Sequence, residues 1–168
     1  MDTNYEMTDG RPTLCLERRL AHPVGSVWTA ITDPRELAQW FPSTIDGELR
    51  DGSRLSFSFP EYDEVPDMEG RVTAFDPPRE LGFDWGSDHL RFELAPAGEH
   101  TDLRLTVRLD SADKAARDGA GWHVCLARLE ARLDGAGEES LKAISDDWRR
   151  HYDEYARRGF PATAPIPS

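Results

Sequence analysis

The chain has 168 residues, of which 38% are hydrophobic and 31% charged, enough for one domain with its own core. Its 20 Lys and Arg against 32 Asp and Glu give a formal net charge of −12, which argues against nucleic acid and anionic membrane surfaces as partners. Two cysteines are too few for a disulfide framework, and neither a secretory signal nor a membrane span of ~18 apolar residues is present. We therefore predict a cytoplasmic protein.

The first predicted elements are one strand and two short helices. Residues 1–12 are polar, and we expect them to be flexible. Alternating residues predict a strand over 13–20, and apolar residues at helical spacing predict helices over 23–31 and 33–41. Asp33 is placed to cap the second of these helices.

From residue 45 onward the hydrophobic period changes to two, which indicates strands. The sequence Asp51-Gly52 is a strong hairpin signal. Because strands joined by short turns pair antiparallel, we expect a meander with one apolar face. The predicted strands span 45–50, 53–59, 69–75, 81–85, 90–94 and 103–109.

An amphipathic helix over 121–135 is predicted to cover this apolar face. A further amphipathic helix is predicted over 138–158, and a flexible tail over 159–168. The layout is α+β, with the main domain over 13–137. The first of these helices is marked by apolar residues at spacings of four, three and four, namely Trp122, Leu126, Leu129 and Leu133.

Four segments occur together in a recognisable order. They read PVGSVWTAITDPRELAQWF (23–41), GELRDGSRLSFSF (47–59), EGRVTAFDPPRELGFDW (69–85) and GWHVCLARLEARLDG (121–135). Residues 13 to about 135 thereby resemble the SRPBCC superfamily. These are the helix-grip proteins related to START lipid-transfer domains and the major birch-pollen allergen. Within the superfamily, the chain is most similar to the bacterial branch named after the activator of the heat-shock-protein-ninety ATPase.

The resemblance implies a strongly bent antiparallel sheet of about seven strands that grips a C-terminal helix, with a cavity between them. Members of the superfamily bind lipids, sterols, polyketides or other apolar molecules. We therefore predict that this chain binds a small hydrophobic or aromatic ligand in the cavity, through burial of apolar surface. The predicted ligand-binding residues are Trp40, Phe57, Phe59, Met68, Phe83, Trp85, Phe92, Trp122 and Cys125.

Two other functions remain open. The cavity of a cyclase-like or hydrolase-like enzyme would need an acid or base, for which His123 is the candidate. A protein-interaction or co-chaperone-like module would use the sheet surface or the helix over 138–158, which could also form a homodimer. No Gly-x-Ser-x-Gly motif is present, and the five His and two Cys lack metal-ligand spacing. We therefore predict neither a metal nor a cofactor.

Overall fold

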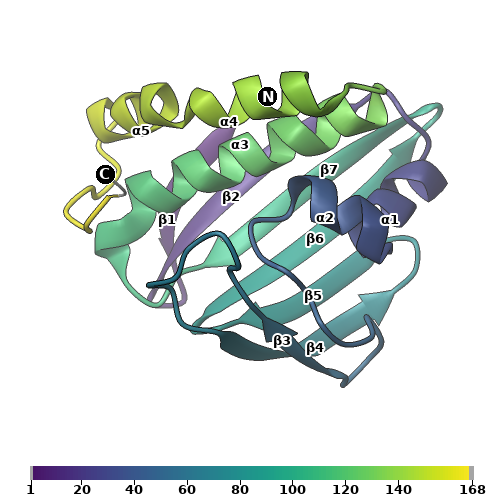
Figure 1. The fold of residues 1–168 in the computed structure, drawn as a ribbon, viewed down its shortest axis with the longest axis horizontal. Helices are drawn as coiled ribbons and strands as arrows, with labels where there is room; N and C mark the ends of the chain where they lie inside the picture. The colour runs from purple at the N-terminus through teal and green to yellow at the C-terminus, as the bar shows by residue number, and fades with distance from the viewer. Residues whose placement is uncertain (1, 167–168) are drawn as a thin grey trace.

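The computed structural model describes residues 2–166. The protein is built on a seven-stranded antiparallel sheet (Figure 1). The strands lie in the order β1-β2-β7-β6-β5-β4-β3. Their bounds are β1 (Thr3–Thr8), β2 (Arg11–Leu20), β3 (Arg54–Phe57), β4 (Met68–Asp76), β5 (Glu80–Trp85), β6 (Asp88–Ala97) and β7 (His100–Arg108). The strands predicted over 13–20, 69–75, 81–85, 90–94 and 103–109 are confirmed as β2 and β4–β7.

Helices cover one face of this sheet. The long helix α3 lies across the sheet, and α4 and α5 pack against α3 (Figure 1). The α+β class and the helix-grip arrangement are confirmed. No helix within residues 2–166 is long and apolar enough to span a membrane. The helices are α1 (Val24–Thr32), α2 (Pro34–Trp40), the 3-10 turn η1 (Ala112–Lys114), α3 (Ala115–Leu133), α4 (Glu138–Asp146) and α5 (Trp148–Arg157).

The hydrophobic core lies between the sheet and α3. Alternation along β7 buries Leu103, Leu105 and Val107 under the helix and turns Arg104 to solvent. The helix contributes the opposing side of the core at helical spacing, through Trp122, Cys125, Leu126 and Leu129. The buried residues of the strand, which alternate, and those of the helix, which recur every three or four positions, therefore form one apolar layer.

The N-terminal segment differs from the prediction. Residues 1–12 were expected to be flexible, but residues 3–8 form β1, which pairs with β2. Asp9 and Gly10 have φ values of 52° and 78°, the left-handed conformations that a two-residue hairpin turn requires. The prediction is wrong for this segment because Asp9-Gly10 is a hairpin turn rather than part of a tail. Residue 1 lies outside the described residues.

Residues 45–50 form no strand, which corrects a second prediction. Only one isolated bridge, between Asp46 and Ser56, joins this segment to the sheet. Gly47 has a φ of 118°, and a Cβ there would lie 2.5 Å from the carbonyl oxygen of Arg54. This conformation interrupts the extended pairing. The segment therefore runs as a loop, and the strand predicted over 53–59 contracts to β3.

The C-terminal third is more ordered than predicted. The long helix begins at Ala115 rather than at 121, and the helix predicted over 138–158 is divided at Asp147 into α4 and α5. The flexible tail predicted over 159–168 is wrong over residues 160–165. Phe160 and Ala164 are buried there. The backbone N–H of Ala116 donates to the carbonyl oxygen of Pro161, and that of Ala164 donates to the carbonyl oxygen of Asp113. Residues 167–168 lie outside the described part of the chain.

Candidate functional site

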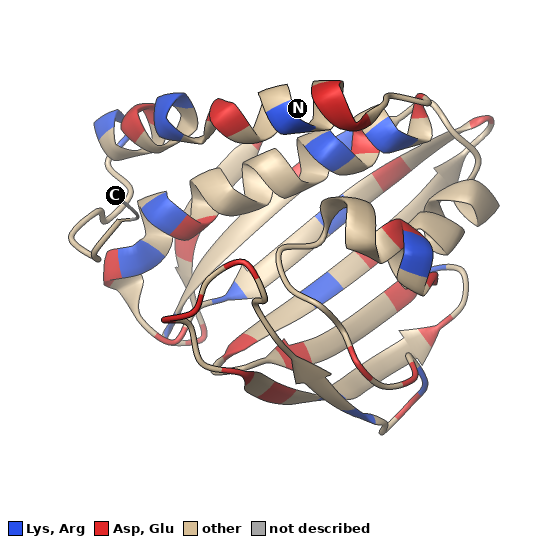
Figure 2. Ribbon diagram, viewed as in Figure 1, with Lys and Arg blue, Asp and Glu red and all other residues tan. Residues whose placement is uncertain are grey.

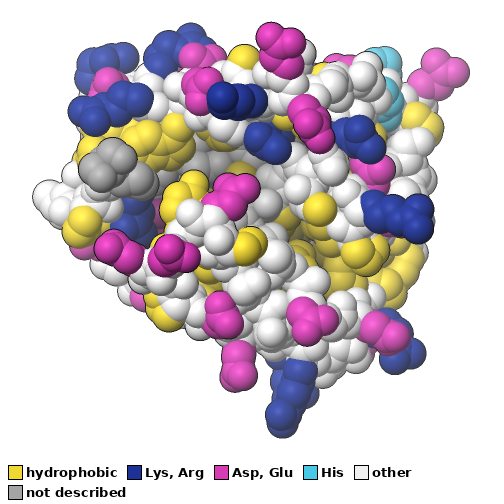
Figure 3. Space-filling model, viewed as in Figure 1, with side chains coloured by type: hydrophobic (Ala, Val, Ile, Leu, Met, Phe, Trp, Pro, Cys, Tyr) yellow, Lys and Arg dark blue, Asp and Glu magenta, His cyan; other side chains and the backbone are white. Residues whose placement is uncertain are grey.

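A cleft of about 1430 Å³ opens between α2, α3 and the loop of residues 58–67 that joins β3 to β4. Met68, Phe75 and Trp85 of the sheet line it, and so do Trp122 and Cys125 of α3. Figure 3 shows this face hollowed below the helices, with hydrophobic side chains at the margin. Ligand pockets usually measure about 300–1,000 Å³, so the cleft has room for a small molecule.

Aromatic rings make up much of the cleft wall. Trp122 and Trp85 meet edge to face, with ring centroids 5.3 Å apart. Phe41 lies 5.7 Å from Trp122 and 5.9 Å from Trp85, and Phe59 lies 6.0 Å from Trp85. The Trp85 indole N–H donates to the hydroxyl of Ser43 at 3.1 Å. Such tilted pairs stabilise one arrangement of the rings, so this part of the wall is preorganised.

Six of the nine predicted ligand-binding residues line the cleft. They are Trp40, Phe59, Met68, Trp85, Trp122 and Cys125. The other three, Phe57, Phe83 and Phe92, are each 1% exposed and lie in the packed core. Phe57 and Phe92 flank Phe83 at centroid distances of 5.9 and 6.4 Å, so their neighbours fill the space that a ligand would need. We keep the six as proposed ligand contacts.

The cleft is also lined by five aromatic residues that were not predicted from the sequence to bind the ligand. They are Trp28, Phe41, Tyr62, Phe75 and Trp148. Phe75 lies on β4 and Tyr62 in the loop between β3 and β4. The other three belong to a helical apolar stripe or its end, a pattern that also describes ordinary core residues. Their position at the cleft depends on how α1, α2 and α4–α5 dock, which the sequence pattern does not specify.

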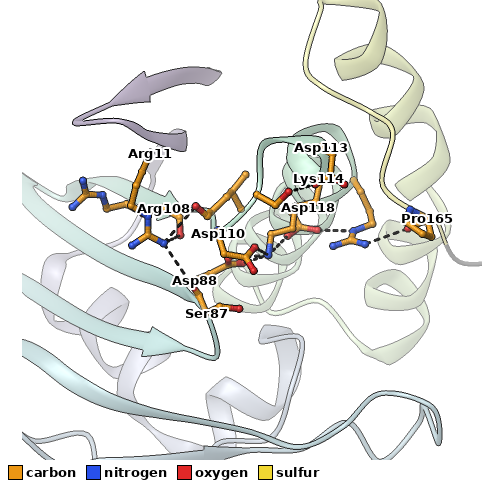
Figure 4. Close-up of polar contacts among 12 residues, drawn as sticks. Arg11, Ser87, Asp88, Arg108, Asp110, Asp113, Lys114, Asp118 and Pro165 are labelled. Atoms are coloured by element: carbon orange, nitrogen blue, oxygen red, sulfur yellow. Dashed lines mark hydrogen bonds and ion pairs between the residues drawn. The ribbon is translucent and has the colours of Figure 1, made fainter.

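One end of the cleft is charged (Figure 4). The Lys114 ammonium lies 2.8 Å from Asp88 Oδ1, 2.6 Å from Asp110 Oδ1 and 3.9 Å from Asp118 Oδ2. Asp88 is buried and also accepts the backbone N–H of Asp110 at 3.0 Å. Burial lowers the pKa of Lys114, but the hydrogen bonds to Asp110 and Asp88 outweigh it, so that the pKa is raised. The ammonium is therefore fixed inside a cage of carboxylates.

Asp118 lies in the first turn of α3 at this charged end. Its Oδ1 accepts a hydrogen bond from Arg117 Nε at 2.8 Å. Burial raises the pKa of Asp118, against the opposing effects of Arg117 and Lys114. Desolvation therefore outweighs the nearby positive charges at this carboxyl group.

His123 points away from the cleft. Its ring stacks on that of His151 in α5, with centroids 3.7 Å apart, and its Nδ1 lies 2.5 Å from the Tyr155 hydroxyl. Burial lowers the pKa of His123 to about 4, and the charges of His151, Arg18 and Arg150 act in the same direction. A neutral imidazole between α3 and α5 holds the two helices together and does not reach a ligand in the cleft.

We expect the free energy of unfolding to fall as the pH decreases from about 6.5 toward 4. In this window His123 binds a proton in the unfolded chain, where its pKa is 6.5, but not in the folded one, where it is about 4. Because the ring is partly solvated, the expected loss is on the order of 1 kcal/mol. Urea titrations of the protein and of His123→Gln at pH 7 and at about pH 4.5 isolate this contribution. Identical pH dependence in both proteins would contradict it.

Cys125 is a passive part of the cleft wall. Burial raises the pKa of its thiol to about 12, so the sulfur is protonated and not nucleophilic at neutral pH. The other cysteine, Cys15, lies on β2 and is also a free thiol. Over residues 2–166, no group of three or more His, Cys, Asp or Glu side chains is arranged to hold a metal ion.

Known structures share this fold. A conserved protein of unknown function from Enterococcus faecalis matches with a TM-score of 0.75 and 21% identity, over 93% of this chain and 89% of that chain. CalU16 from Micromonospora echinospora matches with a TM-score of 0.69 and 21% identity, over 93% of this chain and 94% of that chain. A Bordetella parapertussis protein matches with a TM-score of 0.60 and 28% identity, over 88% and 90% of the respective chains.

A search of curated proteins finds no match to this sequence. The family model described as "Activator of Hsp90 ATPase homolog 1-like protein" matches residues 21–134. This range runs from the end of β2 to the end of α3 and so contains the aromatic residues that line the cleft, apart from Trp148 of α5. It covers more than half of the chain, and the protein therefore belongs to the family of Hsp90 ATPase activator homolog 1-like proteins, within the SRPBCC superfamily.

Proposed function

We propose that this protein binds a small hydrophobic or aromatic ligand in the cleft between the sheet and α3. The observation that carries the proposal is the concentration of aromatic rings around one space of about 1430 Å³. Ligand sites in proteins are typically clefts lined mainly by hydrophobic and aromatic side chains, which is the character of this cleft. The rings that line it are those of Trp28, Trp40, Phe41, Phe59, Tyr62, Phe75, Trp85, Trp122 and Trp148.

Burial of apolar surface would supply the binding free energy. A ligand that buries roughly 200 Å² gains about 5 kcal/mol at about 25 cal/mol per Å². The loss of translational and rotational freedom offsets part of this gain. A gain of 5 kcal/mol corresponds to a Kd of about 0.2 mM before that offset. Small aromatic molecules are therefore expected to bind in the millimolar range, and larger ligands that contact more of the wall to bind more tightly.

The two alternative functions receive less support. The enzymatic alternative depended on His123, which lies between α3 and α5 and not at the cleft. The protein-interaction alternative, including a homodimer, depended on the sheet surface or on the apolar stripe of residues 138–158. Leu141 and Tyr155 of that stripe are buried, and the α4–α5 layer packs on α3 of the same chain. We therefore propose ligand binding and neither catalysis nor a dimer through α4–α5.

Filling the cleft from α3 tests the proposal. Gly121 lines the cleft, and a Cβ there would meet only Trp148 Nε1, at 4.0 Å. We expect Gly121→Leu to weaken binding of the neutral probe N-phenyl-1-naphthylamine by at least about tenfold, because the new side chain occupies ligand space. The same change should raise the free energy of unfolding by about 0.5–1 kcal/mol, because leucine favours the helix over glycine. Probe fluorescence and urea denaturation measure the two effects.

Gly25→Leu is the matched control for this experiment. Gly25 lies in α1, and nothing lies within 4 Å of a Cβ built on it. The control should change stability in the same direction and leave probe affinity unaltered. A wild-type protein that does not bind the probe would contradict the proposal, and so would a Gly121→Leu variant that binds it normally.

A further inference from the structure

The charged end of the cleft and its two central tryptophans lie together. Trp85 ends β5, one tight turn before Asp88 begins β6. On α3, Asp118 and Trp122 are four residues apart and therefore lie on the same side of the helix. All four side chains line the cleft, and the two indole rings touch edge to face at 5.3 Å. A ligand bound against the rings therefore lies beside two carboxylates.

The positive charges at this end are already engaged. Lys114 Nζ donates to both oxygens of Asp88, at 2.8 and 3.0 Å, and lies 2.6 Å from Asp110 Oδ1. Arg117 donates to Asp118 and to the carbonyl oxygen of Pro165. Figure 4 shows Lys114 enclosed by its carboxylate neighbours. An anionic ligand would therefore have to compete with these partners for the two cations.

The negative charge, by contrast, is in excess. Three carboxyl groups, of Asp88, Asp110 and Asp118, surround the two cations Lys114 and Arg117, and of the three carboxyl groups Asp88 and Asp118 line the cleft. A carboxylate can accept about four hydrogen bonds. Asp118 Oδ1 accepts one from Arg117, whereas Lys114 is 3.9 Å from Oδ2, which is beyond hydrogen-bonding distance. The raised pKa of Asp118, caused by burial, agrees with a carboxylate whose charge is incompletely compensated.

The remaining charged groups of the cleft also favour a cationic ligand over an anionic one. Arg128, at the other end, donates to the carbonyl oxygens of Gln39 and Leu141 and is likewise engaged. Figure 2 shows acidic residues on the loop between β3 and β4, which borders the cleft. Indole faces attract cations, and the net charge of −12 favours their approach. The acidic residues of the loop are Glu61, Asp63, Glu64 and Asp67.

We propose that the ligand of this cleft has an apolar or aromatic body and a cationic amine. The amine would donate to Asp118 and lie against the rings of Trp85 and Trp122, while the body occupies the aromatic part of the cleft. This inference rests on the proposed function, because it names the chemical class of ligand for the same site. It adds a preference for charge that a purely apolar cleft would not have.

Three probes that differ only in the group attached to naphthalene test the preference. These are 2-naphthylmethylamine, which is cationic at pH 7, 2-naphthylmethanol, which is neutral, and 2-naphthoate, which is anionic. Isothermal titration calorimetry is expected to give an amine affinity about tenfold above that of the alcohol, with the carboxylate weakest. This ranking uses the unmodified protein, so it decides the proposal even if a variant fails to fold.

Two isosteric variants locate the preference. Asp118→Asn removes one negative charge from the cleft and should lower the amine affinity about tenfold while leaving the alcohol affinity unchanged. Asp51→Asn removes the same charge from an exposed turn outside the cleft and should leave all three affinities in their original ranking.

The outcomes separate this inference from the function on which it rests. Equal affinities for the three probes, or tightest binding of the carboxylate, would overturn the amine preference and leave the binding function intact. Absence of binding by all three would overturn both. A preference that survives Asp118→Asn would overturn the assignment of the amine to Asp118.

Discussion

Replacing Trp40 by alanine is expected to lower the free energy of unfolding by about 3–5 kcal/mol. Trp40 belongs to α2 and is only 2% exposed. Its ring meets those of Phe41 and Phe92 edge to face, at 5.6 and 6.0 Å. Truncation would remove these contacts and leave a cavity that the surrounding rings fill only in part.

The indole N–H gives Trp40 a second role. It donates to the carbonyl oxygen of Ala30 at 2.9 Å, in a buried position. In a continuous helix that carbonyl would accept from the residue four positions later, but this residue is Pro34, which has no N–H. Trp40 therefore supplies the hydrogen bond that α1 lacks at its C-terminal end. Trp40→Phe keeps most of the ring and loses this donor, so we expect a cost of about 1–3 kcal/mol.

Urea denaturation followed by circular dichroism would measure the series. Trp28→Ala is the matched control, since Trp28 is also a helical tryptophan at the cleft but is only half-buried. We expect it to cost less than half as much as Trp40→Ala. A Trp40→Phe variant as stable as the unmodified protein would show that the bond to Ala30 contributes nothing. A Trp28→Ala variant that equals Trp40→Ala would contradict the burial argument.

Features set by nearby residues could be predicted from the sequence. Asp33 caps α2 as expected, and its Oδ1 accepts from the backbone N–H of Arg35 at 2.8 Å and of Glu36 at 3.4 Å. The alternation in β7 and the helical stripe of α3 likewise depend on residues within a few positions of one another. Asp9-Gly10 was a signal of the same local kind, which is why β1 could have been predicted as well.

Features set by distant residues could not be predicted in this way. Phe57 and Phe59 are two residues apart, but β3 ends at Phe57, which is buried in the core, and only Phe59, in the loop that follows, lines the cleft. His123 turns toward α5 because that helix docks behind α3. The ion pair of Lys114 with Asp88 joins residues that are 26 positions apart. No periodicity in a single sequence encodes these contacts.

Gly70→Ala is the second substitution for which we expect a large effect, a loss of about 3 kcal/mol or more in the free energy of unfolding. A Cβ on Gly70 would lie 1.8 Å from the backbone oxygen of Asp84 and 3.0 Å from Phe57 Cε2. The oxygen cannot retreat easily, because Asp84 is paired with His89 in the next strand. A glycine at such a point allows two backbones to approach closely.

Gly82→Ala is the matched control within the same sheet. A Cβ there would meet the Thr73 hydroxyl at 3.1 Å and Ala74 Cβ at 3.4 Å, which are side-chain atoms. These can shift by a few tenths of an ångström, so we expect a cost of about 1 kcal/mol. Equal costs for the two variants would show that the contact with Asp84 does not constrain β4. Because β4 begins at Met68, which lines the cleft, a folded Gly70→Ala protein should also bind the naphthyl probes more weakly than Gly82→Ala.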